Sequence, residues 1–168
     1  MWHHGPNSSK PHATPTNRAI QSEDVILIDM GCKYNGYCSD MTRTIFVDSV
    51  PDYVKPIYDM VRDNQRLIIN ELWEGKLVKD IALMVENNFA SKQHNLLHAC
   101  GHGIGLEGHE IPSLTVKNMS IIKENMVLAI EPGAYLARNF GVRIEDTVLV
   151  KKTNCIELTK SDKNYIII

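Results

Sequence analysis

The chain alternates between two hydrophobic patterns, one typical of strands and one typical of helices. Residues 25–30 are nearly all strand-forming, and the Asn35-Gly36 pair that follows is the strongest short-range signal for a hairpin turn. Residues 45–47 complete the second strand. The pattern therefore predicts a β-hairpin between residues 25 and 47, closed by a two-residue turn.

Two helices are predicted after this hairpin, from apolar side chains spaced three, four and seven residues apart. The first pattern begins at Pro51 and ends at Gly75, a residue type common just after helix ends. Its apolar stripe contains Val54, Ile57, Val61, Ile68 and Leu72, and that of the second helix contains Val78, Ile81, Ala82, Val85 and Phe89. We expect both helices to cover one face of a sheet.

The last third of the chain returns to the strand pattern. Residues 126–130 form an apolar run that ends at Glu131, just before a Pro-Gly turn. Residues 142–150 alternate between apolar and polar and predict one strand. Further short strands are predicted at Cys155 and Tyr165. Strands at both ends and helices between them indicate an α+β fold.

Residues 1–22 are predicted to be an extended, loop-rich lead-in rather than a helix, because Pro6, Pro11 and Pro15 interrupt them. His12 lies between two of these prolines on a stiffened loop. Residues 23–168 then form one domain or most of one, long enough to bury a core.

Composition narrows the functional classes. With 18 basic and 20 acidic residues the net charge is -2, which gives no indication of nucleic acid or of an anionic membrane as a partner. No apolar run approaches the length of a membrane span, and the polar N-terminus lacks the apolar core of a signal peptide. The four cysteines form no CxxC pair, so we expect free thiols and a cytoplasmic protein.

The hairpin carries two aspartates in an otherwise apolar setting. If Asn35-Gly36 is a two-residue turn, Gly31 lies opposite Asp40, and Asp29 lies on the same face as Asp40. The two carboxylates are then diagonal neighbours, about 7–8 Å apart at the backbone. Holding both there costs several kcal/mol unless a proton, a cation or a metal compensates. For either aspartate alone, pairing with Arg43 or capping of a turn is the alternative.

Three histidines, His98, His102 and His109, lie in a glycine-rich stretch between the helices and the last strands. The glycines argue against a helix and predict an irregular or strand-like segment in which backbone or substrate comes close. A neutral core histidine bonded to a backbone carbonyl is the alternative for any one of them.

The strand predicted over residues 142–150 carries further charged groups. Arg143 and Glu145 lie on one face, whereas Asp146 lies on the other, where we expect a structural role. Four carboxylates and one imidazole then stand on or beside strands that could share one sheet: Asp29, Asp40, His102, Glu131 and Glu145. This oxygen-rich set suits Mn²⁺, Co²⁺, Fe²⁺ or Zn²⁺, and four acids suit two cations about 3.5–4 Å apart.

Several motifs together resemble one enzyme family. The segments LIDMG, SDMTRT, GHGIGLEGHE, IEPG and GVRIEDTVLV are similar to those of the pita-bread metallopeptidases, the family of methionine aminopeptidase, aminopeptidase P and prolidase. GPNSSKPHATPT and LTKS further resemble the Xaa-Pro-cleaving branch. The resemblance extends from about Gly5 to the C-terminus. It implies a pita-bread fold, an antiparallel curved sheet covered by helices, with residues 23–168 as the catalytic domain.

The resemblance also implies roles for individual residues. Asp29 matches a chelating ligand of one metal, His102 and Glu131 match ligands of the other, and Asp40 and Glu145 match bridging carboxylates. It implies two divalent ions, with Mn²⁺ first and Co²⁺, Zn²⁺ or Fe²⁺ as alternatives.

Catalytic and substrate-binding roles follow from the same resemblance. Glu131 is expected to transfer a proton from water to the leaving proline nitrogen, and His109 to assist at the scissile carbonyl. His12 and His98 match residues on the proline side of the pocket, with His12 expected among the catalytic residues. Arg143 matches an arginine that supports the site, and it is expected to bind substrate together with His98 and His109. The expected substrate is a peptide with proline at its second position, and homodimerisation is a further expectation.

Some features depart from the family pattern. Gly108 replaces an apolar residue, the loop before Gly141 lacks its usual glycines, and relatives have a further helical and β segment before the region that matches Gly5. We therefore expect an incomplete first half of the fold with an exposed sheet edge. Two other hypotheses remain open: a binding module or inactive catalytic fragment on the same fold, and a metal-free hydrolase resembling creatinase. The latter leaves four mutually repelling acids unexplained.

Overall fold

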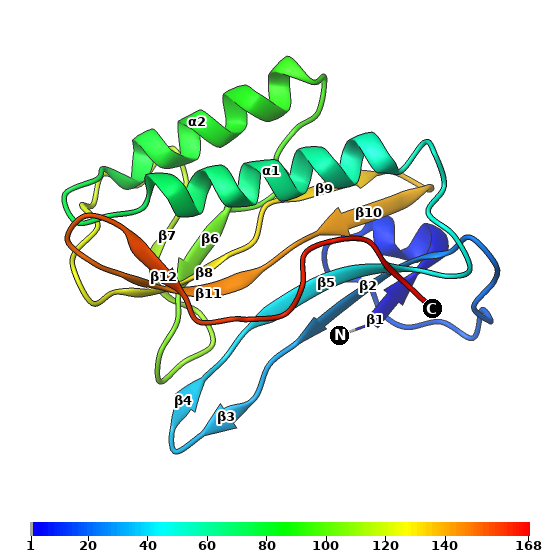
Figure 1. The fold of residues 1–168 in the computed structure, drawn as a ribbon, viewed down its shortest axis with the longest axis horizontal. Coiled ribbons are helices and arrows are strands. Elements are labelled where there is room, and N and C mark those ends of the chain that lie inside the picture. The colour runs from blue at the N-terminus through cyan, green and yellow to red at the C-terminus, as the bar shows by residue number, and fades with distance from the viewer. Residues whose placement is uncertain (1) are drawn as a thin grey trace.

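Two helices lie side by side over one face of a curved and mostly antiparallel arrangement of strands (Figure 1). The computed structural model of the chain describes residues 2–168. The helices are α1 (Lys55–Glu71) and α2 (Val78–Ser91). Both were predicted from their apolar stripes, and the structure confirms them.

The strands form two larger sheets and two short ribbons. The four-stranded sheet has the order β1 (Trp2–His4), β2 (Val25–Met30), β5 (Met41–Phe46) and β13 (Ile166–Ile167). The five-stranded sheet has the order β12 (Cys155–Glu157), β11 (Asp146–Val150), β8 (Val127–Ile130), β6 (Gly101–Gly103) and β7 (Glu110–Ser113). The ribbons pair β3 (Lys33–Tyr34) with β4 (Tyr37–Cys38), and β9 (Gly133–Leu136) with β10 (Phe140–Arg143).

The hairpin around Asn35-Gly36 has the predicted two-residue turn. Tyr34 pairs with Tyr37, and Asn35 and Gly36 have φ angles of 49° and 88°, which suit a type I′ turn. The same register continues into β2 and β5, where Asp29 pairs with Thr42. The hairpin turn thus determines which side chains of β2 and β5 share a face.

The main core lies between α1, α2 and the five-stranded sheet. Fully buried side chains of α1, such as Val61 and Ile68, belong to the same apolar cluster as Leu128 of β8 and Val148 of β11. Burying one side chain of this size contributes about 1.5–3 kcal/mol relative to exposure. This core anchors the strands that carry most of the candidate site.

The lead-in differs from the expectation of an extended loop. It contains strand β1, which pairs with β2 through His3 and Leu27, and a 3₁₀ helix, η1 (Gly5–Ser9). The prolines suggested continuous loop, but Pro6 occupies the first turn of η1, where its missing N–H removes no internal hydrogen bond. The sequence prediction missed both short elements.

The prediction of a single strand over residues 142–150 was wrong. β10 ends at Arg143, β11 begins at Asp146, and the two strands belong to different sheets. The reason is a change of partner at Glu145, whose N–H donates to the carbonyl of Thr42 at 3.1 Å. This single bridge connects the two larger sheets at the position where the candidate site lies.

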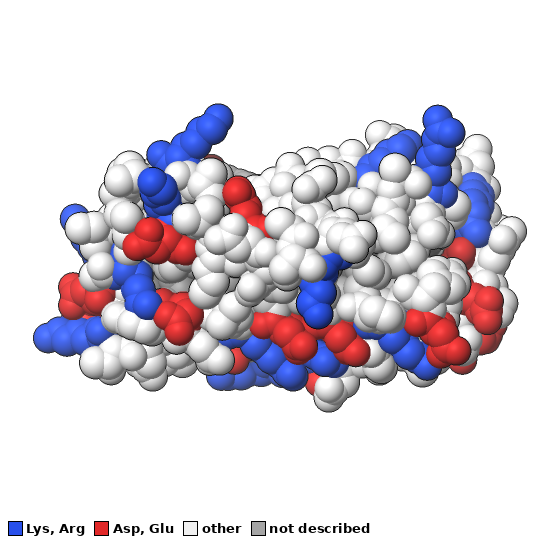
Figure 2. Space-filling view, turned by 90° about the horizontal axis from the view of Figure 1, so that it is seen from above, with Lys and Arg blue, Asp and Glu red and all other residues white. Residues whose placement is uncertain are grey.

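Charged side chains of both signs are interspersed over the face seen from above in Figure 1, so this face presents no extended field of one sign (Figure 2). Among residues 2–168, neither helix is long and apolar enough to cross a bilayer. All four cysteines are free thiols.

Candidate metal centre

One cavity collects the site residues named from the sequence. It has a volume of about 410 Å³ and lies where the two larger sheets meet. Its lining includes all nine of these residues: His12, Asp29, Asp40, His98, His102, His109, Glu131, Arg143 and Glu145. Elements from the start, middle and end of the chain therefore converge on one space.

The five residues predicted as ligands were expected to lie on or beside strands of one sheet, but they do not. Asp29 and Asp40 belong to the β2–β5 hairpin, and His102 belongs to β6 of the five-stranded sheet. Glu131 directly follows β8, and Glu145 lies between β10 and β11. The expectation failed because the strands form two separate sheets, which meet only through long-range contacts such as the bridge between Thr42 and Glu145.

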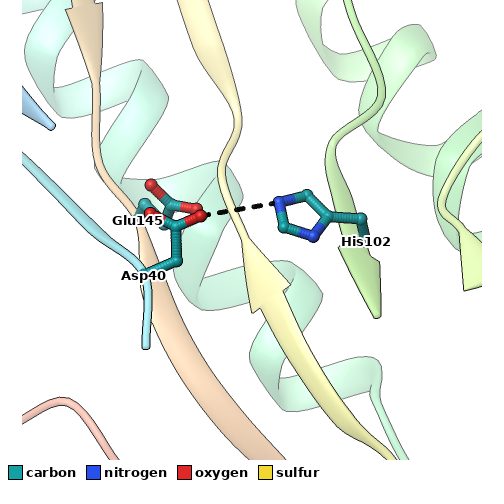
Figure 3. Close-up of side chains that lie close together, drawn as sticks. All are labelled: Asp40, His102 and Glu145. Carbon is teal, nitrogen blue, oxygen red and sulfur yellow. Dashed lines mark ion pairs between the residues drawn. The ribbon is translucent and has the colours of Figure 1, made fainter. Parts of the chain in front are cut away.

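Three of these side chains form a tight group (Figure 3). One ligand atom each from Asp40, His102 and Glu145 lies within 4.8 Å of the others. Glu145 and His102 are 2% and 5% exposed, so bulk water does little to screen them. A fourth group, Glu131, places Oε1 3.7 Å from Nε2 of His102.

The glycines around His102 allow the backbone contacts that position it. A side chain at Gly101 would place Cβ 2.4 Å from the carbonyl oxygen of Ala129, and one at Gly103 would place it 2.4 Å from that of Ile111. Neither approach is sterically allowed, so β6 fits between β8 and β7 only because both positions lack a side chain. This agrees with the prediction of a glycine-rich, strand-like segment.

The tautomer of His102 follows from its hydrogen bond. Nδ1 lies 2.9 Å from the carbonyl oxygen of Gly103 and must donate to it, since a carbonyl only accepts. Burial lowers the pKa of His102, so the ring is neutral and Nε2 carries a lone pair. That lone pair faces Oδ2 of Asp40 at 4.0 Å and Oε1 of Glu131 at 3.7 Å. Three electron-rich atoms thus face one another.

The pKa values of the carboxylates also reflect the crowding of negative charge in the cavity. Burial, followed by the nearby Glu131 and Asp40, raises the pKa of Glu145 to about 8. Burial, together with Asp40 and Asp29, raises the pKa of Glu131 to about 7. The pKa of Asp40 is also raised, first by burial and then by Asp29. Without a cation, this arrangement holds protons that ordinary carboxylates release.

The donor set fits hard divalent metal ions. Carboxylate oxygens and one imidazole nitrogen converge without any thiolate, since Cys38, Cys32 and Cys100 do not line the cavity. A bound cation would lie between atoms that otherwise repel one another, and it would replace the protons that Glu131 and Glu145 hold near neutral pH. Asp40, His102 and Glu145 have the geometry to hold such an ion, and Glu131 and Asp29 line the same cavity as further candidates.

Arg143 lines the cavity, but its guanidinium donors are engaged by neighbouring side chains. Its guanidinium, only 2% exposed, donates from Nη2 to Oδ2 of Asp29 at 2.6 Å and from Nε to Oγ1 of Thr42 at 3.1 Å. Thr42 in turn donates from Oγ1 to Oε2 of Glu145 at 2.6 Å. Arg143 thereby fixes two carboxylates of the set. We expect it to support the centre more than to contact a substrate.

His109 and His12 are exposed residues of the cavity lining, as is Ser113. The ring of His109 stacks on that of His102, with centroids 4.0 Å apart and planes inclined by 25°. His12 directly follows Pro11, whose carbonyl oxygen accepts from Nη1 of Arg143 at 3.3 Å. Both imidazoles therefore lie at exposed positions of the cavity, where a ligand could contact them.

The family of the chain follows from its match to known proteins. The model of metallopeptidase family M24 matches residues 2–152, most of the chain. This chain belongs to metallopeptidase family M24. An uncharacterized peptidase of Methanocaldococcus jannaschii is 42% identical over 162 residues, which make up 94% of this chain and 46% of that protein.

Two further relatives have names that describe an activity. The Xaa-Pro dipeptidase of Pyrococcus horikoshii is 36% identical over 164 residues, covering 96% of this chain and 47% of that protein. The crystal structure of the X-Pro aminopeptidase from Thermotoga maritima matches all of this chain and 48% of its own, with a TM-score of 0.96 and 32% identity. The predicted pita-bread fold is thus confirmed, and the chain spans about half the length of the relatives it matches.

The sequence reasoning did not name Tyr135 of β9, which contacts two residues of the cavity lining. Its hydroxyl accepts from Nη1 of Arg143 at 2.9 Å and lies 2.9 Å from Nε2 of His98. Nδ1 of His98 donates to the carbonyl of Ala99 at 2.8 Å, so Nε2 must accept from Tyr135. Burial raises the pKa of Tyr135 to about 12, which keeps this proton in place. Both nitrogens of His98 are therefore engaged, and a ligand would meet its ring carbons.

We expect Tyr135→Phe to lower the free energy of unfolding of the metal-free M24 chain by about 1–3 kcal/mol, because it leaves one nitrogen of the buried Arg143 and one of the partly buried His98 without this partner. Chemical denaturation followed by circular dichroism measures the loss. The control is Tyr34→Phe at the exposed hairpin, with an expected effect within about 0.5 kcal/mol. Equal effects of the two substitutions would show that the hydrogen bonds of Tyr135 with Arg143 and His98 do not stabilise the fold.

Proposed function

We propose that this chain carries the catalytic centre of a divalent-metal-dependent exopeptidase that hydrolyses the bond between an N-terminal residue and proline. One observation carries the proposal: a neutral histidine, His102, turns its lone pair toward partly buried carboxylates that also repel one another. A cation satisfies all of these groups together. The names of the relatives, Xaa-Pro dipeptidase and X-Pro aminopeptidase, support the choice of substrate.

We further propose two ions, with Mn²⁺ as the first choice. Asp29 would chelate one ion, His102 and Glu131 would bind the other, and Asp40 and Glu145 would bridge them. The oxygen-rich donor set supports Mn²⁺ over metals that prefer thiolates. When bound, such ions acidify a water molecule toward hydroxide and polarise a carbonyl group.

The side chains of the cavity supply the proton transfers of this proposal. Glu131 places Oε1 3.7 Å from Nε2 of His102, and its carboxylate, ionised when a cation is bound, is the group that would accept a proton there. Glu131 would take a proton from the attacking water and deliver it to the proline nitrogen. This delivery matters because the imide nitrogen leaves poorly while it lacks a proton.

The histidines at the rim would handle the substrate. His109, exposed and stacked on His102, would donate a hydrogen bond to the oxyanion that develops on the scissile carbonyl. His12, on the loop between Pro11 and Pro15, and the ring carbons of His98 would contact the proline residue. The cavity volume of about 410 Å³ lies within the range of small-ligand sites, which supports a short peptide as the ligand.

Hydrolysis of an Xaa-Pro dipeptide and an Xaa-Pro-Xaa tripeptide tests the proposal. The chain is stripped with chelator, then assayed with and without Mn²⁺ beside Asp40→Ala. We expect Mn²⁺-dependent release of the N-terminal residue and at least about a 1,000-fold lower rate in the variant, because Asp40 lies in the centre of the ligand group.

The two peptides also separate the candidate activities. Preference for the dipeptide indicates a dipeptidase, and preference for the tripeptide indicates an aminopeptidase. Mn²⁺ binding without turnover would overturn catalysis by this chain alone and leave a metal-binding module. Absence of both Mn²⁺ binding and turnover would overturn the metal centre itself.

A further inference from the structure

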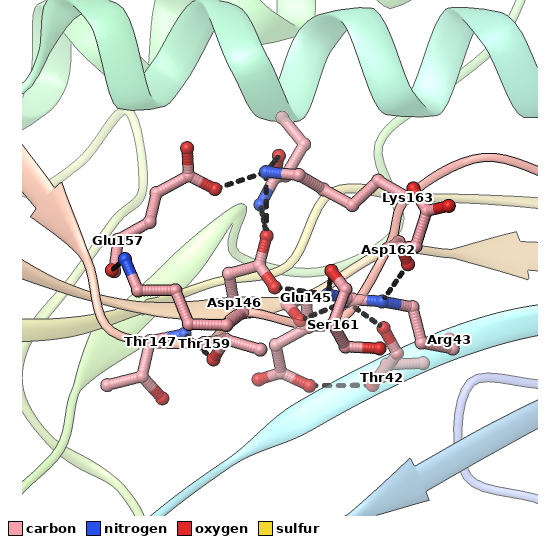
Figure 4. Close-up of polar contacts among 12 residues, drawn as sticks. Thr42, Arg43, Glu145, Asp146, Thr147, Glu157, Thr159, Ser161, Asp162 and Lys163 are labelled. Atoms are coloured by element: carbon pink, nitrogen blue, oxygen red, sulfur yellow. Dashed lines mark hydrogen bonds and ion pairs between the residues drawn. The ribbon is translucent and has the colours of Figure 1, made fainter.

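A second polar cluster lies behind the metal centre, on the other face of β5 and β11 (Figure 4). Its central member is Arg43, which is 3% exposed. The guanidinium donates to the carbonyl oxygens of Thr42 (2.8 Å), Glu145 (2.7 Å), Ser161 (2.9 Å) and Asp162 (2.9 Å), and to Oδ1 of Asp146 (2.6 Å). Five contacts match the five N–H groups of an arginine.

Asp146 completes the charge balance of this cluster. It is fully buried, and its Oδ2 accepts from Nε2 of Gln65 at 2.7 Å and from Nζ of Lys163 at 2.9 Å. Lys163 also forms an ion pair with Glu157. Two cations and two anions thus neutralise one another, with Arg43 and Asp146 buried and Glu157 partly exposed to water. Asp146 has the structural role expected from the sequence.

The cluster binds the C-terminal segment, residues 157–164, to strands β5 and β11. The carbonyls of Ser161 and Asp162 lie on Arg43 of β5. On β11, the N–H of Leu158 donates to the carbonyl of Thr147 at 2.9 Å, and the N–H of Thr147 donates to Oγ1 of Thr159 at 3.0 Å. Residues 157–164 therefore bind both β5 and β11.

These two strands present carboxylates of the candidate metal centre on the opposite face. Asp40 directly precedes β5, and its carbonyl accepts from Oγ1 of Thr147 at 2.9 Å. Glu145 directly precedes β11, and its carbonyl accepts from Arg43. The backbones of both ligand residues are thus held from behind by groups that the segment 157–164 keeps in place.

We propose that residues 157–164, fastened through Arg43 and Asp146, are a clamp that sets the separation of the Asp40 and Glu145 carboxylates and thereby the affinity for metal. Arg43 and Thr147 act as positioning residues, since neither lines the cavity. The proposal rests on the metal centre proposed above. Its physical basis is that ligand atoms must be held within about 0.5 Å of their binding geometry.

Mn²⁺ titration of three single variants tests the clamp. Arg43→Lys keeps the charge but retains at most three of the five N–H donors, and Thr147→Val removes only the hydroxyl that holds the Asp40 carbonyl. We expect Mn²⁺ affinity to fall by about tenfold or more in Arg43→Lys and by about fivefold in Thr147→Val. Val85→Ala, in the core beneath α2, should change it less than about twofold despite its own loss of stability.

Amide hydrogen exchange in the metal-free protein gives a readout that needs no metal. The N–H of Glu145, bonded to the Thr42 carbonyl, should exchange at least about tenfold faster in Arg43→Lys at unchanged protection of α2. Mn²⁺ affinity within twofold of the parent in both clamp variants would overturn the proposal, as would unchanged exchange at Glu145. Failure of the parent to bind Mn²⁺ would instead overturn the proposed function, with exchange still deciding the clamp. If Arg43→Lys does not fold, Thr147→Val decides alone.

Discussion

Glu145→Gln is expected to lower the affinity for Mn²⁺ by at least about 100-fold and, at pH 9, to raise the free energy of unfolding of the metal-free protein by on the order of 2 kcal/mol. The two effects have one cause. Glu145 is 2% exposed, and burial with Glu131 and Asp40 nearby raises its pKa to about 8, so its negative charge is costly without a cation. The same charge would attract the proposed cation.

Glutamine tests this reasoning because it keeps the shape and one acceptor. Its amide oxygen can still accept from Oγ1 of Thr42, which now lies 2.6 Å from Oε2 of Glu145. Isothermal titration calorimetry measures the affinity, and urea denaturation at pH 9 measures the stability. Glu86→Gln, on the exposed face of α2, is the matched control and should alter neither quantity. Loss of stability in Glu145→Gln would contradict the charge argument.

Local patterns predicted the parts of the site that short-range geometry determines. The register set by Asn35-Gly36 places Asp29 opposite Thr42 and diagonal to Asp40, as counting from the turn predicts. Thr42 could have been added to the site by the same counting, because it shares the face of Asp40. The helices followed from apolar spacing in the same local way.

Long-range contacts explain what the sequence did not predict. The split between β10 and β11 depends on Thr42, a residue far from Glu145 in the chain, and no local pattern encodes that partner. Tyr135 belongs to the site only because Arg143 and His98 approach it from other elements. Arg43 binds four backbone carbonyls. Every residue type carries this group, so the pattern of side chains could not predict these partners of Arg43.

The family resemblance supplied the proposed ligand set, and the structure adds a physical reason for this set to favour a cation. Arg143 donates to Asp29 and is the buried guanidinium of the cavity lining, so one positive charge faces four carboxyl groups. The remaining imbalance appears as the raised pKa values of Glu131 and Glu145. The crowded carboxylates therefore lower the free energy of unfolding of the metal-free protein, and the size of this loss depends on pH.

The stability of the metal-free protein is expected to fall by about 2 kcal/mol as pH rises from 6.5 to 8.5. Glu145, with an ordinary pKa of 4.5, holds its proton in the folded state up to about pH 8, whereas the unfolded chain has already released it. The folded state binds more protons, so its advantage is lost as pH rises and levels off above the folded pKa. Glu131 contributes in the same direction up to about pH 7.

The pH range is chosen so that opposing groups do not mask this fall. Burial lowers the pKa of His98 and His102, so their stabilising contribution rises with pH, but only up to about the ordinary value of 6.5. Chemical denaturation at half-unit steps above that value, with chelator, measures the slope. Saturating Mn²⁺ should remove the fall, because it binds the ionised carboxylates, and Glu145→Gln should flatten it without metal. A stability that rises between pH 6.5 and 8.5 in chelator would show that the buried carboxylates are not the groups that oppose folding.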